Sequence, residues 1–467
     1  MDKRIVALFV AAIVVQTVWS QRVLSLDSCR TMALRNNKQM SVSRVKQKMA
    51  SNLRKSARTQ YLPRVSAVGG YLYTSRELSI LSDEQKDGLT RIGSLIGNVL
   101  QPLRPVISQG SQQLIDAFET DTRHTLAAGI VVTQPVFMGG AIMAANKLAS
   151  INEQFEENSA EVQRQATLYQ IEQTYWQVVS LRHKQKLAQG YLDLVKKLDG
   201  DVQKMIREGV ATRSEGLSVS VKVNEAEMTL MQVEDGLSLS RMLLCQLCGL
   251  PVSEQVILAD EDEDSITAHA GISAICEEAG VAVATENRPE LKMLQNAVDM
   301  SKQTTNILKA GNLPQVLLMG GWAGMNPNLY NGFEHKFKGA WNVGVLVRVS
   351  LWNWGDVMCK VRAAKGATTI AELEMEEIRE KIELQVSQSE FHVNEAAKKL
   401  EQAWAGIERA EENLRTANLG FSEGVISSTT VMEAQTAWLQ ARSQLIDAEI
   451  DVKLSQVNLQ KALGTLQ

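Results

Sequence analysis

Two kinds of hydrophobic pattern alternate along this chain. In the first, every second side chain is apolar, as between Trp341 and Leu351, where the intervening positions are small or polar apart from Leu346. A period of two puts successive side chains on opposite faces of a β-strand. One apolar and one mixed face suit a barrel wall between lipid and water, although a strand of a soluble sandwich alternates in the same way.

The second pattern is a heptad repeat. Two segments without proline, 140–208 and 355–423, would each span about 100 Å as helices, at 1.5 Å per residue. Rows at intervals of seven begin at Val393, at Ala396 and, after a glycine, at Val431. Large residues facing small ones at this spacing predict antiparallel helical hairpins. Taken alone, this pattern favours an ordinary coiled-coil stalk.

The chain is internally duplicated. Residues 36–70 align with 287–321, and 129–249 with 344–464, both without a gap, so the first copy carries an extra segment between residues 74 and 125. We expect a mainly α protein with a small β-barrel portion, made of duplicated strand and long-helix hairpin repeats. The predicted segments are a signal peptide, 1–20; a first repeat, 21–249, with strands 64–74 and 124–136 and helices 140–208 and 211–249; a linker, 250–272; and a second repeat, 273–467, with strands 315–325 and 337–352 and helices 355–423 and 426–463.

The amino terminus indicates export, and the aromatic residues indicate a membrane setting. Lys3 and Arg4 precede an apolar run, and Ser20 is a suitable cleavage position, which predicts a secretory signal peptide. Aromatic rings at the ends of the strands are typical of membrane interfaces. The rings that gather there are Tyr71, Tyr73, Phe137, Trp322, Tyr330, Phe333, Phe337, Trp341, Trp352 and Trp354.

Composition excludes several classes of function. The net charge of −4 gives no basic surplus for nucleic acid, and the five histidines lie too far apart for a metal site. No phosphate-binding loop, nucleophile elbow or metalloprotease motif is present, so we expect no enzyme activity, cofactor or metal. Cys245 and Cys248 are more readily explained as packing residues than as a redox or metal motif. The acidic run 260–264 fits a solvated linker better than a calcium site.

Several motifs of this chain resemble those of a known family, the TolC-type outer-membrane efflux proteins. The resemblance covers essentially the whole mature chain. The motifs that carry the resemblance near the amino terminus are Leu26-Asp27-Ser28-Cys29 and the segment of residues 33–37 that follows it. Further along the chain they are Gln134-Pro135-Val136-Phe137 before Gly139-Gly140, the two Glu-Gly-Val turns, and Ala462-Leu463-Gly464 at the end of the second repeat. It implies a homotrimer with a shared twelve-stranded transmembrane β-barrel in outer-membrane lipid and a periplasmic α-helical tunnel. It also implies a passive exit duct of a tripartite efflux pump or type I secretion system of a Gram-negative cell. The partners that the resemblance implies for this duct are a periplasmic adaptor (membrane fusion protein) and an inner-membrane RND or ABC transporter.

The resemblance also implies roles for particular residues. The adaptor-docking tips correspond to two equivalent turns, Glu208-Gly209-Val210 and Glu423-Gly424-Val425. The acidic positions of the family's periplasmic gate read Thr430 and Glu433 here, and the matching acidic position after the first turn is Glu215. Ile426 replaces the family's partner arginine, and Arg213 is a candidate substitute.

Three classes of protein compete for these features. A transport conduit explains both the strands and the helices. A structural coiled-coil protein of the envelope has no use for lipid-facing strands. A periplasmic adaptor would carry lipoyl-like and barrel domains around a single helical hairpin, whereas this chain has two copies of strands followed by a long helix.

Overall fold

The computed structural model describes residues 22–75, 81–99, 104–117, 123–261, 277–328 and 335–466. The predicted signal peptide lies outside these residues. The chain divides into two compact units, one of Met1–Ala50, Asn152–Val298 and Ile370–Gln467, and one of Ser51–Ile151 and Asp299–Thr369. Each unit contains segments of both repeats. The boundaries between the units fall inside helices, the longest ones included, so each of these helices contributes to both units.

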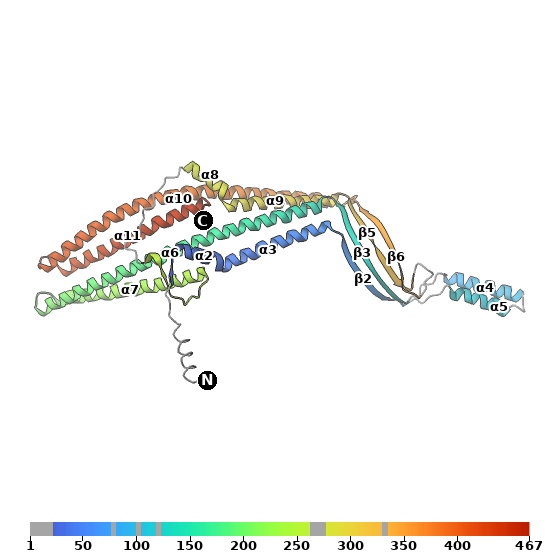
Figure 1. The fold of residues 1–467 in the computed structure, drawn as a ribbon, viewed down its shortest axis with the longest axis horizontal. Coiled ribbons are helices and arrows are strands. Elements are labelled where there is room, and N and C mark those ends of the chain that lie inside the picture. The colour runs from blue at the N-terminus through green and yellow to red at the C-terminus, as the bar shows by residue number, and fades with distance from the viewer. Residues whose placement is uncertain are drawn as a thin grey trace, which may run out of the picture. The chain divides into compact units, whose positions relative to one another are not determined.

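The same series of elements occurs twice along the chain (Figure 1). The first series is α2 Leu26–Asn36, α3 Lys38–Arg58, β2 Arg64–Tyr73, β3 His124–Met138, α6 Ala141–Arg207 and α7 Arg213–Cys248. The second is α8 Glu277–Asn287, α9 Pro289–Lys309, β5 Gln315–Asn326, β6 Lys338–Arg348, α10 Asp356–Ser422 and α11 Ser428–Ala462. Single 3₁₀ turns, η1 Thr59–Tyr61 and η4 Ala310–Asn312, end α3 and α9.

One unit contains a four-stranded antiparallel sheet in the order β2-β3-β5-β6. A register shift between Pro135 and Phe137 interrupts the pairing of β3 with β5, at a proline that has no N–H to donate. β6 ends at Arg348, earlier than the predicted residue 352. The reason is the turn into α10, in which Trp354 and Gly355 adopt φ values of 54° and 77°.

The extra segment of the first repeat contains two helices, α4 Asp83–Val99 and α5 Arg104–Ala117, which pack against each other. They lie between β2 and β3 in the chain, in the same unit as the sheet. Several apolar side chains of this pair are exposed, among them Leu95 and Val106.

The heptad rows form the core of the other unit. α6, α7, α10 and α11 meet in one cluster, to which Val195 and Val219 contribute from the first repeat and Leu414 and Val431 from the second. Seven-residue steps keep each row on one side of its helix, so the rows face the neighbouring helices. A salt bridge of 2.6 Å between Lys184 Nζ and Asp447 Oδ1 also joins α6 to α11.

The predicted solvated linker is partly wrong. Within it, β4 Val256–Leu258 pairs in parallel with β1 Arg22–Leu24, and Val256, Leu258 and Glu261 are almost completely buried. Glu261 accepts from Arg241 Nη2 at 2.6 Å, which compensates the burial of its charge. Residues 262–276, with the rest of the acidic run, lie outside the described residues.

Both helical hairpins turn through the same hydrogen-bonded motif. At the first turn Val210 N donates to Met205 O and Gly209 N to Ile206 O; at the second, Val425 N donates to Gly420 O and Gly424 N to Phe421 O. Gly209 and Gly424 have φ values of 75° and 72°, a left-handed conformation that glycine adopts without a steric penalty. The arrangement is a Schellman motif, in which otherwise unpaired carbonyls at the helix end gain partners.

The two turns differ in how they fill one position. A Cβ placed on Gly420 would lie 2.5 Å from Ile426 Cδ1, so the isoleucine needs the glycine. In the first repeat, Met205 stands at the position of Gly420, and Ala211 stands at the position of Ile426. The first repeat thus has a large residue where the second has a small one, and a small residue where the second has a large one. The volumes at the two positions are therefore exchanged between the repeats.

This exchange gives a testable prediction. Gly420→Met alone should overpack the turn and destabilise the protein by about 1–3 kcal/mol. Adding Ile426→Ala should recover most of that loss, because the pair then reproduces the first turn. Chemical unfolding of the single and double variants measures the coupling energy.

Gly406→Met, combined with the same Ile426→Ala, is the matched control. Gly406 also lies inside α10, and a Cβ there would meet no atom within 4 Å. The control effects should add to within about 0.5 kcal/mol. Additive effects for the Gly420 pair as well would contradict the proposed packing.

Candidate functional site

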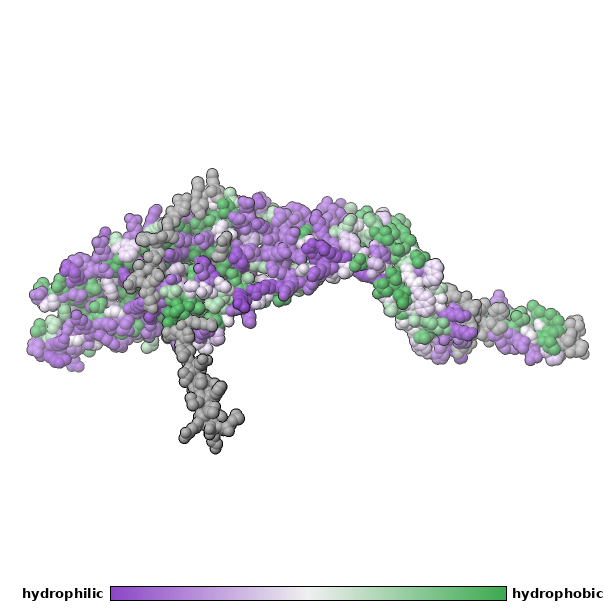
Figure 2. Space-filling view, viewed as in Figure 1, coloured by the Kyte–Doolittle hydropathy of each residue, from purple (hydrophilic) through white to green (hydrophobic). Residues whose placement is uncertain are grey.

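The register of the sheet gathers apolar side chains on one face. Trp341 pairs with Trp322 and Trp322 with Ile130, while Val343, Gly320, Val132 and Val65 form a neighbouring row. These positions share a face because each pair lies directly opposite across the ladder. Figure 2 shows hydrophobic residues gathered over the strands, whereas much of the surface over the long helices is hydrophilic.

The opposite face is mixed, with small, polar and some apolar residues such as Leu346 and Met319. Asn342, Gly321, Val131 and Ser66 form one row across the four strands. Lys338 and Arg348, near the two ends of β6, belong to the same face because they lie an even number of residues from Asn342. The sheet thus has one apolar face and one mixed face, and the mixed face is the more compatible with water.

Both edges of the sheet are open in the described part of the single chain. There, β2 and β6 are the outer strands of the order, and each pairs with one neighbour. Every residue of β2 is exposed, and Trp341 in β6 is 79% exposed. Unpaired edges with large exposed apolar side chains indicate a surface that another chain or a membrane covers.

Aromatic rings mark both ends of the strands. At one end Tyr71 and Tyr73 lie beside His124, with a distance of 2.6 Å between Tyr71 Oη and His124 Nδ1. Trp322 contacts Phe337 toward the same end. At the opposite end Trp352 and Trp354 meet edge to face. Phe137 also lies at this opposite end, whereas Tyr330 and Phe333 fall outside the described residues.

The predicted tip residues lie at the two hairpin turns. Glu208, Gly209 and Val210 connect α6 to α7, and Glu423, Gly424 and Val425 connect α10 to α11. Val210 and Val425 are 71% and 81% exposed. Each turn therefore presents an apolar side chain to solvent at the end of a rigid hairpin.

Two of the predicted gate residues, Glu215 and Thr430, each lie three residues after the N-cap of their helix. Thr212 caps α7 and Glu215 is its third residue: Glu215 N donates to Thr212 Oγ1, and Thr212 N donates to Glu215 Oε2 at 2.7 Å. The hydrogen bonds that Thr212 N and Thr212 Oγ1 donate to Glu215 Oε2 lower the pKa of the Glu215 carboxyl. In α11 the cap is Ser427, and Thr430 N donates to Ser427 Oγ.

The other predicted gate residues are exposed near the start of the returning helices. Glu433 lies one turn after the start of α11, and Arg213 is the first residue of α7. Ile426, which the resemblance places at the family's arginine position, packs at Gly420. Thr430 can be recognised as the partner of the capping residue Ser427 only once the start of the helix is known.

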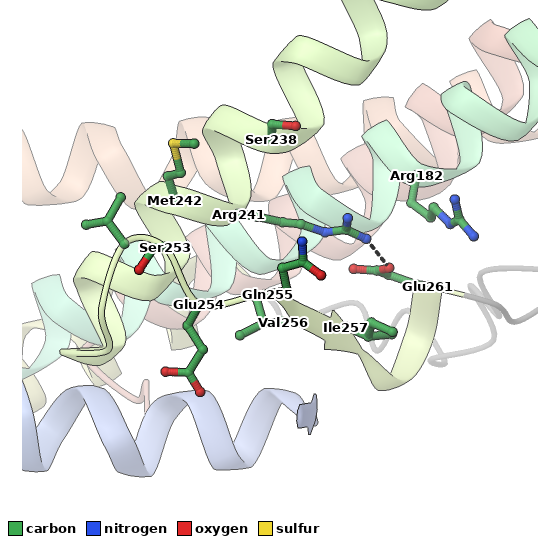
Figure 3. A pocket seen from close by; sticks show the side chains of 11 residues that line it. Arg182, Ser238, Arg241, Met242, Ser253, Glu254, Gln255, Val256, Ile257 and Glu261 are labelled. Atoms are coloured by element: carbon green, nitrogen blue, oxygen red, sulfur yellow. Dashed lines mark hydrogen bonds and ion pairs between the residues drawn. The ribbon is translucent and has the colours of Figure 1, made fainter. Parts of the chain in front are cut away.

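A buried polar site near β4 was not predicted from the sequence. Arg241 binds Glu261 beside a cavity of about 460 Å³, and the side chain of Arg182 also lines it (Figure 3). Close by, Tyr175 Oη donates to Asp260 Oδ2 at 2.6 Å, and burial raises the pKa of this phenol. Arg30 similarly pairs with Glu172, whose carboxyl pKa is raised by burial. A charged residue inside a polar run gives no sequence signal that it will be buried.

The described part of the chain contains no group of three or more histidine, cysteine or acidic side chains placed to hold a metal ion.

Within the described ranges, no helix has both the length and the apolarity needed to cross a membrane.

Comparison with known proteins relates these features to a family. The model of the family described as "Outer membrane efflux protein" matches residues 30–250 and 281–465, one stretch in each repeat. Outer membrane protein TolC of Vibrio cholerae is 21% identical over 351 residues, which cover 73% of this chain and 77% of that protein. Proteases secretion protein PrtF of Dickeya chrysanthemi is 24% identical over 271 residues, 56% of each chain.

Solved structures share the fold. The outer-membrane channel OprN superposes with a TM-score of 0.76 at 14% identity, covering 94% of this chain and 89% of its own. VceC of Vibrio cholerae gives a TM-score of 0.75 at 14% identity, covering 94% and 96%. The family is one of channels and not of enzymes, and its function favours a conduit over a purely structural coiled-coil protein. This chain therefore belongs to the outer membrane efflux protein family, whose members are outer-membrane ducts for efflux and secretion.

Proposed function

We propose that three copies of this chain form a passive duct through the outer membrane. A periplasmic adaptor opens this duct and joins it to an inner-membrane transporter of the RND or ABC type. The observation that carries the proposal is the sheet, which has an apolar face, a water-compatible face and two open edges. Cargo follows the water-compatible face, and the transporter supplies the energy.

The strand order supports closure by several copies. A membrane leaves no backbone N–H or C=O without a partner, so open edges must pair. Because β2 and β6 run in opposite directions within the sheet, β6 of one copy can meet β2 of the next antiparallel. Three copies give twelve strands, four from each chain. Four strands alone are too few to enclose a water-filled pore.

The sheet faces and the trimer can be tested together. Val345→Lys puts a charge on the apolar face, where near the middle of a bilayer it costs about 2–4 kcal/mol. Gly344→Lys, one residue earlier, puts the same charge on the water-compatible face, where a Cβ would meet no atom within 4 Å. Chemical cross-linking in detergent of protein extracted from the outer membrane should give a three-chain species for the wild type and Gly344→Lys, and much less for Val345→Lys.

A stable monomer from wild-type membranes would contradict the trimer. Equal trimer yields from the two lysine variants would contradict the assignment of the faces.

We further propose that the hairpin turns dock the adaptor. Exposed apolar residues at the ends of rigid helices are suitable anchors for a partner. Val210→Ser combined with Val425→Ser should reduce export by roughly tenfold or more, the effect of losing about 1.4 kcal/mol of binding. Export assays in cells, with the amount of trimer in the outer membrane measured in parallel, check the result.

Thr429→Ala, an exposed change in the first turn of α11, is the matched control and should leave export unchanged. Full export by the double valine variant would refute docking through these side chains.

The proposed gate contains Glu433 and Thr430, near the start of α11. It also contains Glu215 and Arg213, near the start of α7. Three Glu433 carboxylates near a three-fold axis would attract cations, and divalent cations most strongly. Glu215 contributes less, because its carboxylate already accepts from its own N-cap. Thr430 carries no charge, so the ring has fewer carboxylates than the resemblance implies.

Single-channel conductance in planar bilayers tests the gate. Glu433→Gln should lower the preference for cations and relieve block by divalent ions, since it removes one charge per chain. Glu408→Gln, an exposed change on α10, should alter neither property. If Glu433→Gln behaves like this control, Glu433 is an ordinary solvated carboxylate at the start of a helix.

A further inference from the structure

Three cysteines from distant parts of the chain are buried together. Cys29 in α2 and Cys245 and Cys248 in α7 belong to one hydrophobic cluster, and each is at most 1% exposed. Cys359, by contrast, is exposed on α10. The sequence spacing indicated no disulfide framework, but a framework is not required for one bridge between distant residues.

Cys29 and Cys248 are neighbouring free thiols, and Cys248 Sγ lies 3.9 Å from Cys29 O. The side chain of Cys248 therefore already touches the main chain of Cys29, and such proximity is what a disulfide between two cysteines requires.

The neighbouring residues hold the ends of α2 and α7 in register. Asn37 Nδ2 donates to Leu247 O at 3.2 Å, and Asn36 Nδ2 donates to Cys248 O at 3.5 Å. A Cβ on Gly249 would lie 2.6 Å from Asn36 Cβ, so the two backbones pack closely where α7 ends. The contact of Cys248 with Cys29 is therefore a fixed feature of this packing.

Cys245 lies one helical turn away and has a different neighbour. Its Sγ lies 3.6 Å from Glu254 O, in the segment that follows α7. Cys248 is thus the better-placed partner for Cys29. A metal is not favoured, because the described residues include no set of three ligands placed for one.

Proteins of the outer membrane pass through an oxidising compartment, in which disulfides form and persist. We infer that Cys29 and Cys248 form a disulfide in the exported protein. The inference depends on the location of the family and not on the proposed duct. It adds a covalent link between the first helix after the predicted signal peptide and the end of the first repeat, residues that are 219 positions apart.

The reaction is thiol–disulfide exchange with an exported oxidoreductase that carries a disulfide. The Cys29 thiolate attacks that disulfide and releases one thiolate of the oxidoreductase. Cys248 then loses its proton and attacks the Cys29 sulfur of the mixed disulfide. The new S–S bond forms, and the oxidoreductase leaves as a dithiol with two electrons and two protons. Since both cysteines are buried in the folded chain, the exchange precedes the final packing of α2 on α7.

Thiol mapping of the protein from outer membranes tests the inference. Cells are quenched with an alkylating reagent, and the protein is denatured without reductant and digested. We expect a linked pair of peptides containing residues 29 and 248, which separates on reduction. Of the five cysteines, at least these two should resist alkylation until reductant is added.

Serine variants make the assignment specific. Cys245→Ser and Cys359→Ser should keep the linked peptides, whereas Cys248→Ser should lose them and leave Cys29 open to alkylation. Alkylation of all five wild-type cysteines without reductant would overturn the inference, as would a link from Cys29 to Cys245. The wild-type map decides the matter even if a variant does not accumulate.

Discussion

Backbone amides and carbonyls within a bilayer need hydrogen-bond partners inside the protein, and a four-stranded sheet lacks such partners along its two edges. Much else in this chain can be understood from that constraint. β2 and β6 are exposed, large apolar side chains cover one face, and a mixture of glycine, polar and some apolar side chains lines the other. Because the number of strands is even, copies of the chain can join with every pair antiparallel. In the proposed assembly, the open edges of one copy pair with those of its neighbours.

The helical unit meets a different requirement, since its helices are surrounded by water. Heptad rows of α6, α7, α10 and α11 bury their large and small residues against one another. The same Schellman motif closes both hairpins, and a side-chain N-cap begins each returning helix. Rigid turns of this kind allow a long hairpin to end sharply, so the exposed valines at the two ends hold defined positions.

The sequence was most informative where a pattern repeats many times. The predicted helix 140–208 corresponds to α6, Ala141–Arg207, because the heptad rows extend over many turns and no proline interrupts them. Period-two alternation similarly located β6, although its end was misjudged where Trp354 and Gly355 turn the chain.

Short elements and isolated contacts could not be predicted from the sequence. β4 has three residues, too few to show a period, and its partner β1 lies far away in the chain. The pairing of Arg241 with Glu261, and the contact of Cys29 with Cys248, depend on tertiary packing that leaves no local pattern. Glu215 remains a proposed gate residue, and its hydrogen bond with Thr212 could be recognised only once the helix boundary was known.

The exchange of volumes between the two turns bears on how such a protein can change over evolutionary time. If the halves were separate, identical subunits, one substitution would alter every turn of the assembly at once. Fusion in a single gene lets each half drift alone, so Gly420 and Ile426 can be inherited together while Met205 and Ala211 stay as they are. The two turns can therefore specialise, and a partner that meets both encounters two different surfaces.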